Sequence, residues 1–171
     1  GAEIQGPLYA AMRPVIVNGE LYSNYGATEA LPVAEIDGET VLGETWALSE
    51  QGAGLCVGFP LPGVEAKIIE IDDEDIATID DAKELPVGEI GELIVRSQHV
   101  SDYYFKAEKD MAANKISDGD TRWQRLGDTG FRKEASVAAS LSAGARVVNS
   151  TAGTPKAAGG GVSDRGEGGG S

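Results

Sequence analysis

Cysteine, histidine and basic residues are scarce in this 171-residue chain, and each shortage excludes a class of protein. The single cysteine, Cys56, cannot form a disulfide within the chain, and with one histidine it cannot complete a Cys/His zinc site. Acidic side chains outnumber basic ones 28 to 14, for a formal net charge of −14. This excess disfavours binding to nucleic acid or to an anionic membrane surface. The length accommodates one domain of ordinary size.

Long apolar runs and a signal sequence are also absent. No segment approaches the roughly 18 apolar residues of a membrane span. The N-terminus, GAEIQGPLYA, lacks the basic-then-apolar pattern of a secretory signal, and it does not begin with Met. We therefore expect a cytoplasmic protein whose given sequence begins within a longer chain.

The composition divides the chain into two parts. All aromatic residues lie between Tyr9 and Phe131, whereas residues 136–171 contain none and are rich in glycine. Such a segment has too few apolar side chains to offset the entropy that it would lose on ordering. We expect a folded body over residues 1–135. The tail over residues 136–171 is expected to be disordered.

The body has the pattern of a mixed α/β (α+β) fold in which strands predominate. Apolar and charged residues alternate at 64–71, as in a half-buried strand, and a turn signal at 86–88 precedes a second strand at 90–96. The remaining expected elements are a helix at 7–13, a short strand at 20–23 leading into a loop at 24–29, a helix at 103–115, and a strand–turn–strand at 123–131.

Several features that suggest chemistry are better explained as structural. The acidic run at 72–75 has Ala77 and Lys83 where a calcium loop needs Gly and Glu, so we interpret it as a solvated hairpin tip. His99 has no orienting carboxylate nearby in the sequence, and Cys56 lies between apolar residues. We expect a surface or packing histidine and a small core thiol. The glycine-rich tail contains no Gly-Lys pair, which excludes a P-loop.

Two short motifs have the composition of a nucleotide site. The first, at 24–29 (Asn-Tyr-Gly-Ala-Thr-Glu), places a ring, a flexible glycine, a hydroxyl and a carboxylate within six residues. A ring can pack on a base, a hydroxyl can contact a phosphate oxygen, and a carboxylate can bind Mg²⁺. The second, at 125–131 (Arg-Leu-Gly-Asp-Thr-Gly-Phe), places Asp128 on a glycine-flanked turn. There the carboxylate either binds two ribose hydroxyls or forms an ordinary Asx turn.

In this order and spacing, the motifs resemble those of the adenylate-forming superfamily of acyl-CoA synthetases and firefly luciferases. The stretch at 54–63 resembles the G-x-V-G-x-P-x-P-G segment of that family, and the stretch at 88–95 resembles its G-E-x-G-E-L-x-V segment. The sequences at 25–33, 84–92 and 113–120 are similar to those of the olefin β-lactone synthetases. The resemblance implies that the body, residues 1–135, is a partial AMP-binding (adenylation) domain, a strand-rich fragment of the large N-terminal domain of such an enzyme.

The resemblance also implies an AMP-forming ligase reaction that uses ATP and Mg²⁺. The carboxylate of a β-hydroxy fatty acid would attack the α-phosphate of ATP, giving an acyl-adenylate and pyrophosphate. The β-hydroxyl would then close on the activated carbonyl, releasing AMP and leaving a β-lactone, a step favoured by proximity. The expected partners are ATP and a fatty-acid-type carboxylate, without nucleic acid. Association with other enzymes of the olefin pathway is a further expectation.

Residues that contact the nucleoside are carried over from the family by position. Tyr25, followed by Gly26, would pack on the adenine, and Gly1 and Ala2 would line it. Asp128 would bind the ribose hydroxyls. Each of these assignments is implied by the resemblance.

The same resemblance implies catalytic roles for Thr28 and Glu29. Thr28 would contact the phosphate, and Glu29 would bind the magnesium ion. Together they would stabilise charge on the phosphate oxygens.

The sequence departs from the family pattern in two places. The Ser/Thr/Gly-rich phosphate loop that precedes these motifs in the family is absent. After residues 131–134 the family continues with a Gly-Arg hinge and a small domain that carries a catalytic Lys. Here Ser-Val-Ala-Ala at 136–139 leads into the tail, as a frameshift or a truncated gene prediction would produce. We therefore expect a fragment that is inactive alone.

Three other interpretations remain open. The chain is a fragment of a fatty acyl-CoA ligase, which shares the adenylation step, or a non-catalytic binding module derived from the superfamily. The third interpretation is a chance match by an unrelated acidic β-rich protein, against which the order of the motifs argues.

Overall fold

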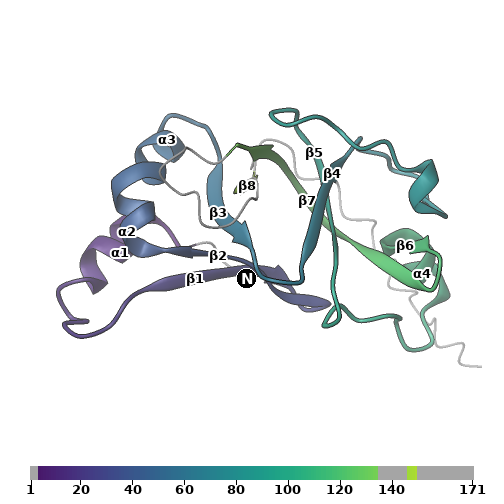
Figure 1. Cartoon of the computed structure of the whole chain (residues 1–171), viewed down its shortest axis with the longest axis horizontal. Coiled ribbons are helices and arrows are strands. Elements are labelled where there is room, and N and C mark those ends of the chain that lie inside the picture. The colour runs from purple at the N-terminus through teal and green to yellow at the C-terminus, as the bar shows by residue number, and fades with distance from the viewer. Residues whose placement is uncertain (1–3, 135–145, 150–171) are drawn as a thin grey trace, which may run out of the picture.

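Antiparallel strand pairing organises the part of the chain that the computed structural model describes, residues 4–134 and 146–149 (Figure 1). The described strands form one eight-stranded sheet in the order β1-β2-β3-β8-β7-β5-β4, and β6 pairs with β7. The strands are β1 (Tyr22–Ala27), β2 (Ala30–Asp37), β3 (Leu55–Pro60), β4 (Glu65–Ile69), β5 (Gly91–Arg96), β6 (Lys115–Asp118), β7 (Thr121–Lys133) and β8 (Arg146–Asn149). The helical segments are α1 (Gly6–Met12), α2 (Gly38–Thr40), η1 (Val41–Thr45), α3 (Trp46–Glu50), η2 (Ile79–Asp81) and α4 (Glu108–Asn114).

Strand β5 is buried on both faces. Its consecutive residues Leu93, Ile94 and Val95 are at most 2% exposed, although neighbours along a strand point to opposite faces. Leu93 and Val95 pack into one apolar cluster, whereas Ile94 packs with Trp123 in another. A strand covered on both sides needs a continuous apolar run, and the sequence at this point has one.

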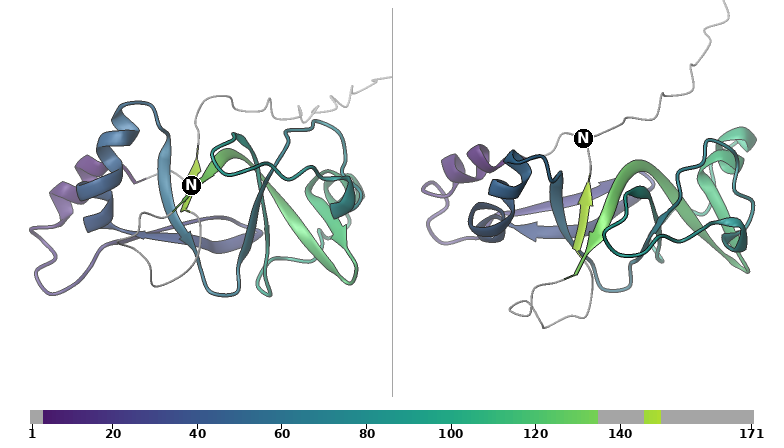
Figure 2. Two further views of the ribbon diagram at one scale, coloured as in Figure 1. Left: turned by 45° about the horizontal axis from the view of Figure 1, so that its top comes forward. Right: turned by 90° about the horizontal axis from the view of Figure 1, so that it is seen from above.

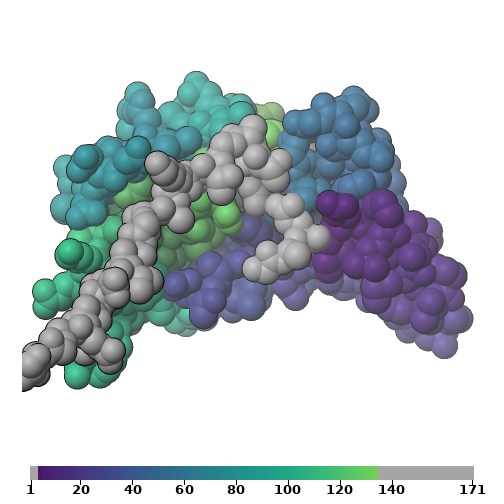
Figure 3. Space-filling model, turned by 180° about the vertical axis from the view of Figure 1, so that it is seen from behind, coloured from purple at the N-terminus to yellow at the C-terminus, as the bar shows by residue number. Residues whose placement is uncertain are grey.

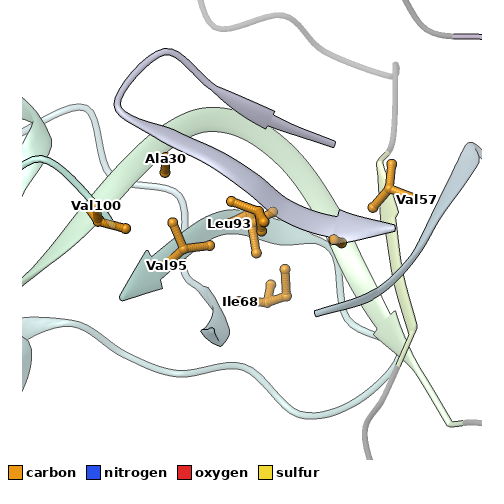
Figure 4. Packing of buried hydrophobic residues seen from close by; sticks show 8 residues of the cluster. Ala30, Val57, Ile68, Leu93, Val95 and Val100 are labelled. Atoms are coloured by element: carbon orange, nitrogen blue, oxygen red, sulfur yellow. The ribbon is translucent and has the colours of Figure 1, made fainter. Parts of the chain in front are cut away.

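The larger of these clusters joins strands that are distant in the sequence (Figure 4). It draws side chains from β2, β3, β4 and β5 and from the loop after β5. Its buried members are Ala30, Val33, Ala34, Val57, Ile68, Leu93, Val95 and Val100. The hairpin β1–β2 is therefore held against the β4–β5 pair by apolar burial, which is the dominant favourable term in folding.

Helices α1, α2 and α3 gather at one end of the molecule, beside β1 and β2, whereas α4 lies beside β6 at the other end (Figures 1 and 2). The space-filling view shows the purple N-terminal residues at one end of the molecule (Figure 3). Tyr9 of α1 packs with Ile36 of β2 and Val41 of η1 in a third apolar cluster. A Cβ at Gly6 would meet the Trp46 ring at 2.4 Å, so the absence of a side chain there lets α1 approach α3. None of the helices in the described ranges is long and apolar enough to cross a membrane.

Several sequence predictions are confirmed with small shifts of their ends. The helix expected at 7–13 is α1, and the strands expected at 64–71 and 90–96 are β4 and β5. The turn expected at 86–88 contains Gly88, whose φ of 92° favours glycine.

The helix expected at 103–115 is shorter than predicted, since α4 begins only at Glu108. Tyr103 and Phe105 are 69% and 82% exposed, so the apolar spacing that favoured a helix does not face a core. Lys106 also has a positive φ of 53°, outside the right-handed helical region. Periodicity alone therefore overestimated this helix.

The loop expected at 24–29 is wrong in its first part, because β1 continues through Ala27. Pairing with β2, which the sequence analysis did not predict, extends the strand beyond its own weak local signal. The strand–turn–strand expected at 123–131 is likewise one continuous strand, β7, which carries an irregularity at Gly127.

Within the tail that composition predicted to be disordered, Arg146–Asn149 forms strand β8. This short segment contains two consecutive valines, which favour strands, and it pairs with both β3 and β7. The other residues of the predicted tail, 136–145 and 150–171, lie outside the described residues.

The two-sided burial of β5 makes Leu93 a test of the core. We expect Leu93→Ala to lower the free energy of unfolding by about 2–5 kcal/mol, because it removes buried apolar contacts and leaves a cavity. Leu8→Ala, at a position that is 50% exposed, is the matched control and should cost no more than about 0.5 kcal/mol. Urea unfolding followed by circular dichroism measures both, and equal losses would contradict this account of the core.

Candidate functional site

The first motif forms the tip of the β1–β2 hairpin. Thr28 and Glu29 make the turn between the strands, and Tyr25 pairs with Ala34 just before a register shift at Gly26. A Cβ at Gly26 would lie 2.3 Å from the carbonyl oxygen of Ala30, so the hairpin can close this tightly only over a glycine. The sequence thus places Tyr25 and Glu29 on either side of an obligatory glycine.

The second motif lies at a bulge within β7. Arg125 pairs with Ile94 and Thr129 pairs with Glu92, so the segment between Arg125 and Thr129 is longer than the segment opposite it on β5. Gly127 has a φ of 71° at this point. Bulges of this kind re-aim side chains, and here the re-aimed side chain is Asp128.

One hydrogen bond joins the two motifs across 103 residues of sequence. The Tyr25 hydroxyl donates to Oδ2 of Asp128 at 2.5 Å, and both side chains are partly buried. A hydrogen bond to a carboxylate is among the stronger kinds in proteins. The hairpin and the bulge are thereby held together as one wall.

This wall borders a cavity of about 740 Å³. Among the residues that line it are Tyr25, Gly26, Thr28, Glu29, Trp46, Leu126 and Asp128. The volume lies within the range of small-molecule sites, about 300–1,000 Å³. Four of the five described residues predicted to bind nucleotide or metal are at least partly buried here, whereas Thr28 is exposed at the turn. The predicted adenine-lining residues, Gly1 and Ala2, lie outside the described residues.

The charge of the cavity wall bears on which ligand fits. Glu29 and Asp128 contribute carboxylates, and the described residues that line the cavity include no Lys, Arg or His. A free phosphate would therefore be repelled, whereas Mg²⁺ takes carboxylate oxygens and carries substrate phosphates with it. The chemistry of these groups suits a magnesium-bound nucleotide, because one carboxylate could hold the metal ion and the other could accept hydrogen bonds.

Glu29 also has a partner on its other side that the sequence analysis missed. The hydroxyl of Tyr104 donates to Oε1 of Glu29 at 3.1 Å, and Nε2 of Gln124 donates to the Tyr104 oxygen at 3.2 Å. Burial raises the pKa of the Tyr104 phenol; the hydrogen bond from Gln124 lowers this pKa, and the negative charge of Glu29 raises it. The phenol is therefore protonated at neutral pH and able to donate.

A buried amine lies beside this tyrosine. Lys115 is only 4% exposed, and its Nζ donates to the backbone oxygen and the hydroxyl of Ser101. The same Nζ lies 5.4 Å from the centroid of the Tyr104 ring, within the range of a cation–π contact. Burial lowers the pKa of the amine, and the negative charge of Glu29 opposes that shift.

Arg125 holds the bulge from the opposite face of β7. It makes an ion pair with Glu92 at 2.7 Å, and the two side chains are 11% and 8% exposed. The same nitrogen, Nη2, also donates to the carbonyl of Asp72, and Nη1 donates to the carbonyl of Glu74, which ties the acidic run to the sheet. The hydrogen bond to Glu92 raises the pKa of the guanidinium, against the effect of burial.

The two residues that sequence reasoning assigned to structural roles behave accordingly. His99 is exposed, and its Nε2 lies 2.8 Å from the carbonyl oxygen of Pro32, an acceptor to which it must donate. Its Nδ1 lies 2.9 Å from the hydroxyl of Ser97. Cys56 is half-buried and packs against the cluster of Tyr9, Ile36 and Val41.

Comparison with known proteins identifies a family for this arrangement. A family model described as AMP-binding enzyme matches residues 1–105, which include the hairpin motif. Olefin beta-lactone synthetases of Stenotrophomonas maltophilia and Xanthomonas campestris are 39% and 37% identical in alignments 137 residues long that cover 77% of this chain. Those residues are 25% and 24% of the relatives, so the chain spans about a quarter of the length of the curated relatives it matches.

A solved structure supports the same fold. The amide bond synthetase McbA of Marinactinospora thermotolerans is 26% identical and superposes with a TM-score of 0.56. The match covers 86% of this chain and 24% of that one. The mixed α/β, strand-rich architecture expected from the sequence is therefore confirmed.

The buried ion pair generates a test of how the bulge is held. We expect Arg125→Met to lower the free energy of unfolding by about 3–5 kcal/mol, because it leaves the buried Glu92 carboxylate uncompensated. Arg13→Met is the matched control, since Arg13 and its partner Glu39 are 62% and 65% exposed and such pairs contribute about 0–1 kcal/mol. Chemical unfolding of both variants measures the difference. A loss at Arg125 no larger than at Arg13 would show that the pair does not hold the bulge.

Proposed function

Because the chain belongs to the AMP-binding enzyme family, we propose that its cavity binds magnesium-bound ATP in an enzyme that adenylates a carboxylate. The observation that carries the proposal is the hydrogen bond between Tyr25 and Asp128. It holds the Tyr25 ring beside the Asp128 carboxylate, and Glu29 lines the same cavity, whose volume suits a small-molecule ligand.

Each side chain has a distinct role in this proposal. The ring of Tyr25 packs against the adenine, and the close turn at Gly26 keeps that ring at the cavity wall. Asp128 accepts hydrogen bonds from the ribose hydroxyls; each carboxylate oxygen has two lone pairs, so the bond from Tyr25 does not block this.

Thr28 and Glu29 bind the phosphate end of the nucleotide. The exposed hydroxyl of Thr28 donates to a phosphate oxygen, and Glu29 holds the magnesium ion. When bound, the ion supplies a positive charge, which the described residues lining the cavity lack, and stabilises charge on the phosphates.

The names of the curated relatives support a β-hydroxy fatty acid as the substrate, since both are olefin beta-lactone synthetases. A carboxylate oxygen of the substrate attacks the α-phosphorus of ATP, and the bond to pyrophosphate breaks. The β-hydroxyl oxygen then attacks the acyl carbon, loses its proton, and displaces AMP to close the four-membered lactone. The enzyme holds the hydroxyl near the carbonyl, which makes ring closure a matter of proximity.

The described residues that line the cavity are better suited to nucleotide binding than to catalysis of the whole reaction. No cationic side chain among its described lining residues could stabilise the charge that develops on phosphate, and the chain spans about a quarter of its curated relatives. We propose that this chain supplies the nucleoside and metal contacts and does not turn over substrate alone.

Nucleotide titration tests the binding proposal, with Trp46 as an intrinsic fluorescent reporter because it lines the cavity. We expect ATP to bind more tightly with Mg²⁺ than without it. Asp128→Asn should weaken adenosine and ATP alike by about 10-fold or more, because it removes charge-assisted hydrogen bonds to the ribose. Glu29→Gln should abolish the gain due to Mg²⁺ and leave adenosine unaffected.

Asp120→Asn, which alters an exposed carboxylate outside the cavity, is the control and should bind every ligand as the parent does. A parent chain that binds neither adenosine nor Mg²⁺-ATP at millimolar concentration would refute the nucleotide site. The same titration monitored by calorimetry excludes quenching without binding.

A further inference from the structure

Glu29 lines two cavities, and a different set of side chains surrounds it in each. The larger cavity, of about 740 Å³, is bordered by Tyr25 and Asp128. A smaller one, of about 270 Å³, is bordered by Tyr104 and Gln124. Glu29 lines both cavities, whereas Tyr104 lines only the smaller of the two. Tyr104 thus contacts Glu29 from outside the cavity in which the nucleotide is proposed to bind.

The orientation of the Gln124 amide is set by its neighbours. Gln124 is 2% exposed, and its Nε2 lies 2.6 Å from the carbonyl oxygen of Arg125. A carbonyl oxygen only accepts hydrogen bonds, so the nitrogen of the amide must face it. The same nitrogen lies 3.2 Å from the Tyr104 oxygen, to which it donates its second hydrogen.

This donation determines what the tyrosine hydroxyl does. Because Gln124 donates to the Tyr104 oxygen, the hydroxyl hydrogen is left for an acceptor, and Oε1 of Glu29 lies 3.1 Å away. The hydrogen bonds therefore run in one direction, from a buried amide anchored on β7 through the hydroxyl to the carboxylate. A hydrogen bond at Oε1 fixes the carboxylate plane and hence the direction in which Oε2 points.

The backbone around Glu29 is held from the same side. The amide N–H of Ser101 donates to the carbonyl oxygen of Glu29 at 2.9 Å. Ser101 also accepts from the Nζ of Lys115, which packs over the Tyr104 ring. The segment that contains Ser101 and Tyr104 therefore holds both the main chain and the side chain of Glu29.

Resting on the proposed function, we propose that Tyr104 is a positioning residue that orients the Glu29 carboxylate toward the divalent cation accompanying the nucleotide. Tyr104 touches neither the nucleotide nor the metal. It acts by restricting the rotation of Glu29, so that the carboxylate does not lose this freedom when the ion binds. Partners of this kind typically change metal affinity by about 10- to 100-fold when they are removed.

The variant Tyr104→Phe removes only the hydroxyl and keeps the ring. We expect the gain in ATP affinity produced by Mg²⁺ to fall by about 10-fold or more. Binding of adenosine without metal should stay within about 2-fold of the parent, since the nucleoside contacts line the larger cavity, which Tyr104 does not line. Direct binding of Mn²⁺ in the presence of ATP, followed by electron paramagnetic resonance, should weaken in parallel.

Tyr103→Phe is the matched control, because Tyr103 is the preceding residue and is 69% exposed. It should leave all three measurements unchanged. An undiminished metal-dependent gain in Tyr104→Phe overturns the inference, and so does an equal loss of adenosine binding, which would mark a general effect on the cavity.

Glu29→Gln, titrated alongside, separates failure of the inference from failure of the proposed function. If Glu29→Gln retains the gain due to Mg²⁺, the metal role of Glu29 is wrong and the inference falls with it. If Glu29→Gln loses the gain and Tyr104→Phe keeps it, only the positioning role is wrong.

Discussion

The geometry of the site depends on a buried guanidinium. Arg125 lies three residues before Asp128, at the point where the register between β5 and β7 shifts. Its ion pair with Glu92 joins the two strands, and its bonds to the carbonyls of Asp72 and Glu74 attach the acidic run. Its own carbonyl oxygen anchors the amide of Gln124. Through its side chain and its main-chain carbonyl, Arg125 therefore connects the bulge that presents Asp128 with the hydrogen bonds that reach Glu29.

Both carboxylates of the site occupy irregular positions on a regular sheet. Glu29 lies at a hairpin turn and Asp128 at a bulge, and in each case a neighbouring glycine permits a backbone geometry that other residues resist. The strands that carry them are held by the two-sided burial of β5. Rigid strands thus set the separation of the two groups, while the turn and the bulge direct them into one cavity.

How far the sequence predicts this arrangement depends on the range of the interaction. The apolar runs of β4 and β5 and the glycine-flanked motifs are local signals, and the strands and the likeness to adenylate-forming enzymes followed from them. The extent of β1 and the continuity of β7 depend on pairing partners, which no local pattern identifies. Tyr104 carries no signal at all, since only the fold brings it to Glu29 across 75 residues. Gln124 and Arg125, which shortly precede Asp128 in the sequence, could have been considered as buried polar groups of the same motif.

The charged side chains among the described residues that line the cavity are all acidic. This has a consequence for the ionic strength at which the chain is studied. Most sites that bind anionic ligands attract them electrostatically, and added salt screens this attraction beyond a Debye length of about 10 Å at 0.1 M. The affinity of such sites therefore falls as the ionic strength rises. Here metal-free ATP meets Glu29, Asp128 and a chain of net charge −14, so the dominant long-range force is repulsion. Added monovalent salt therefore strengthens the association of the bare nucleotide and weakens that of the cation. The affinity for the nucleotide and the affinity for its metal ion therefore change in opposite directions as the ionic strength rises.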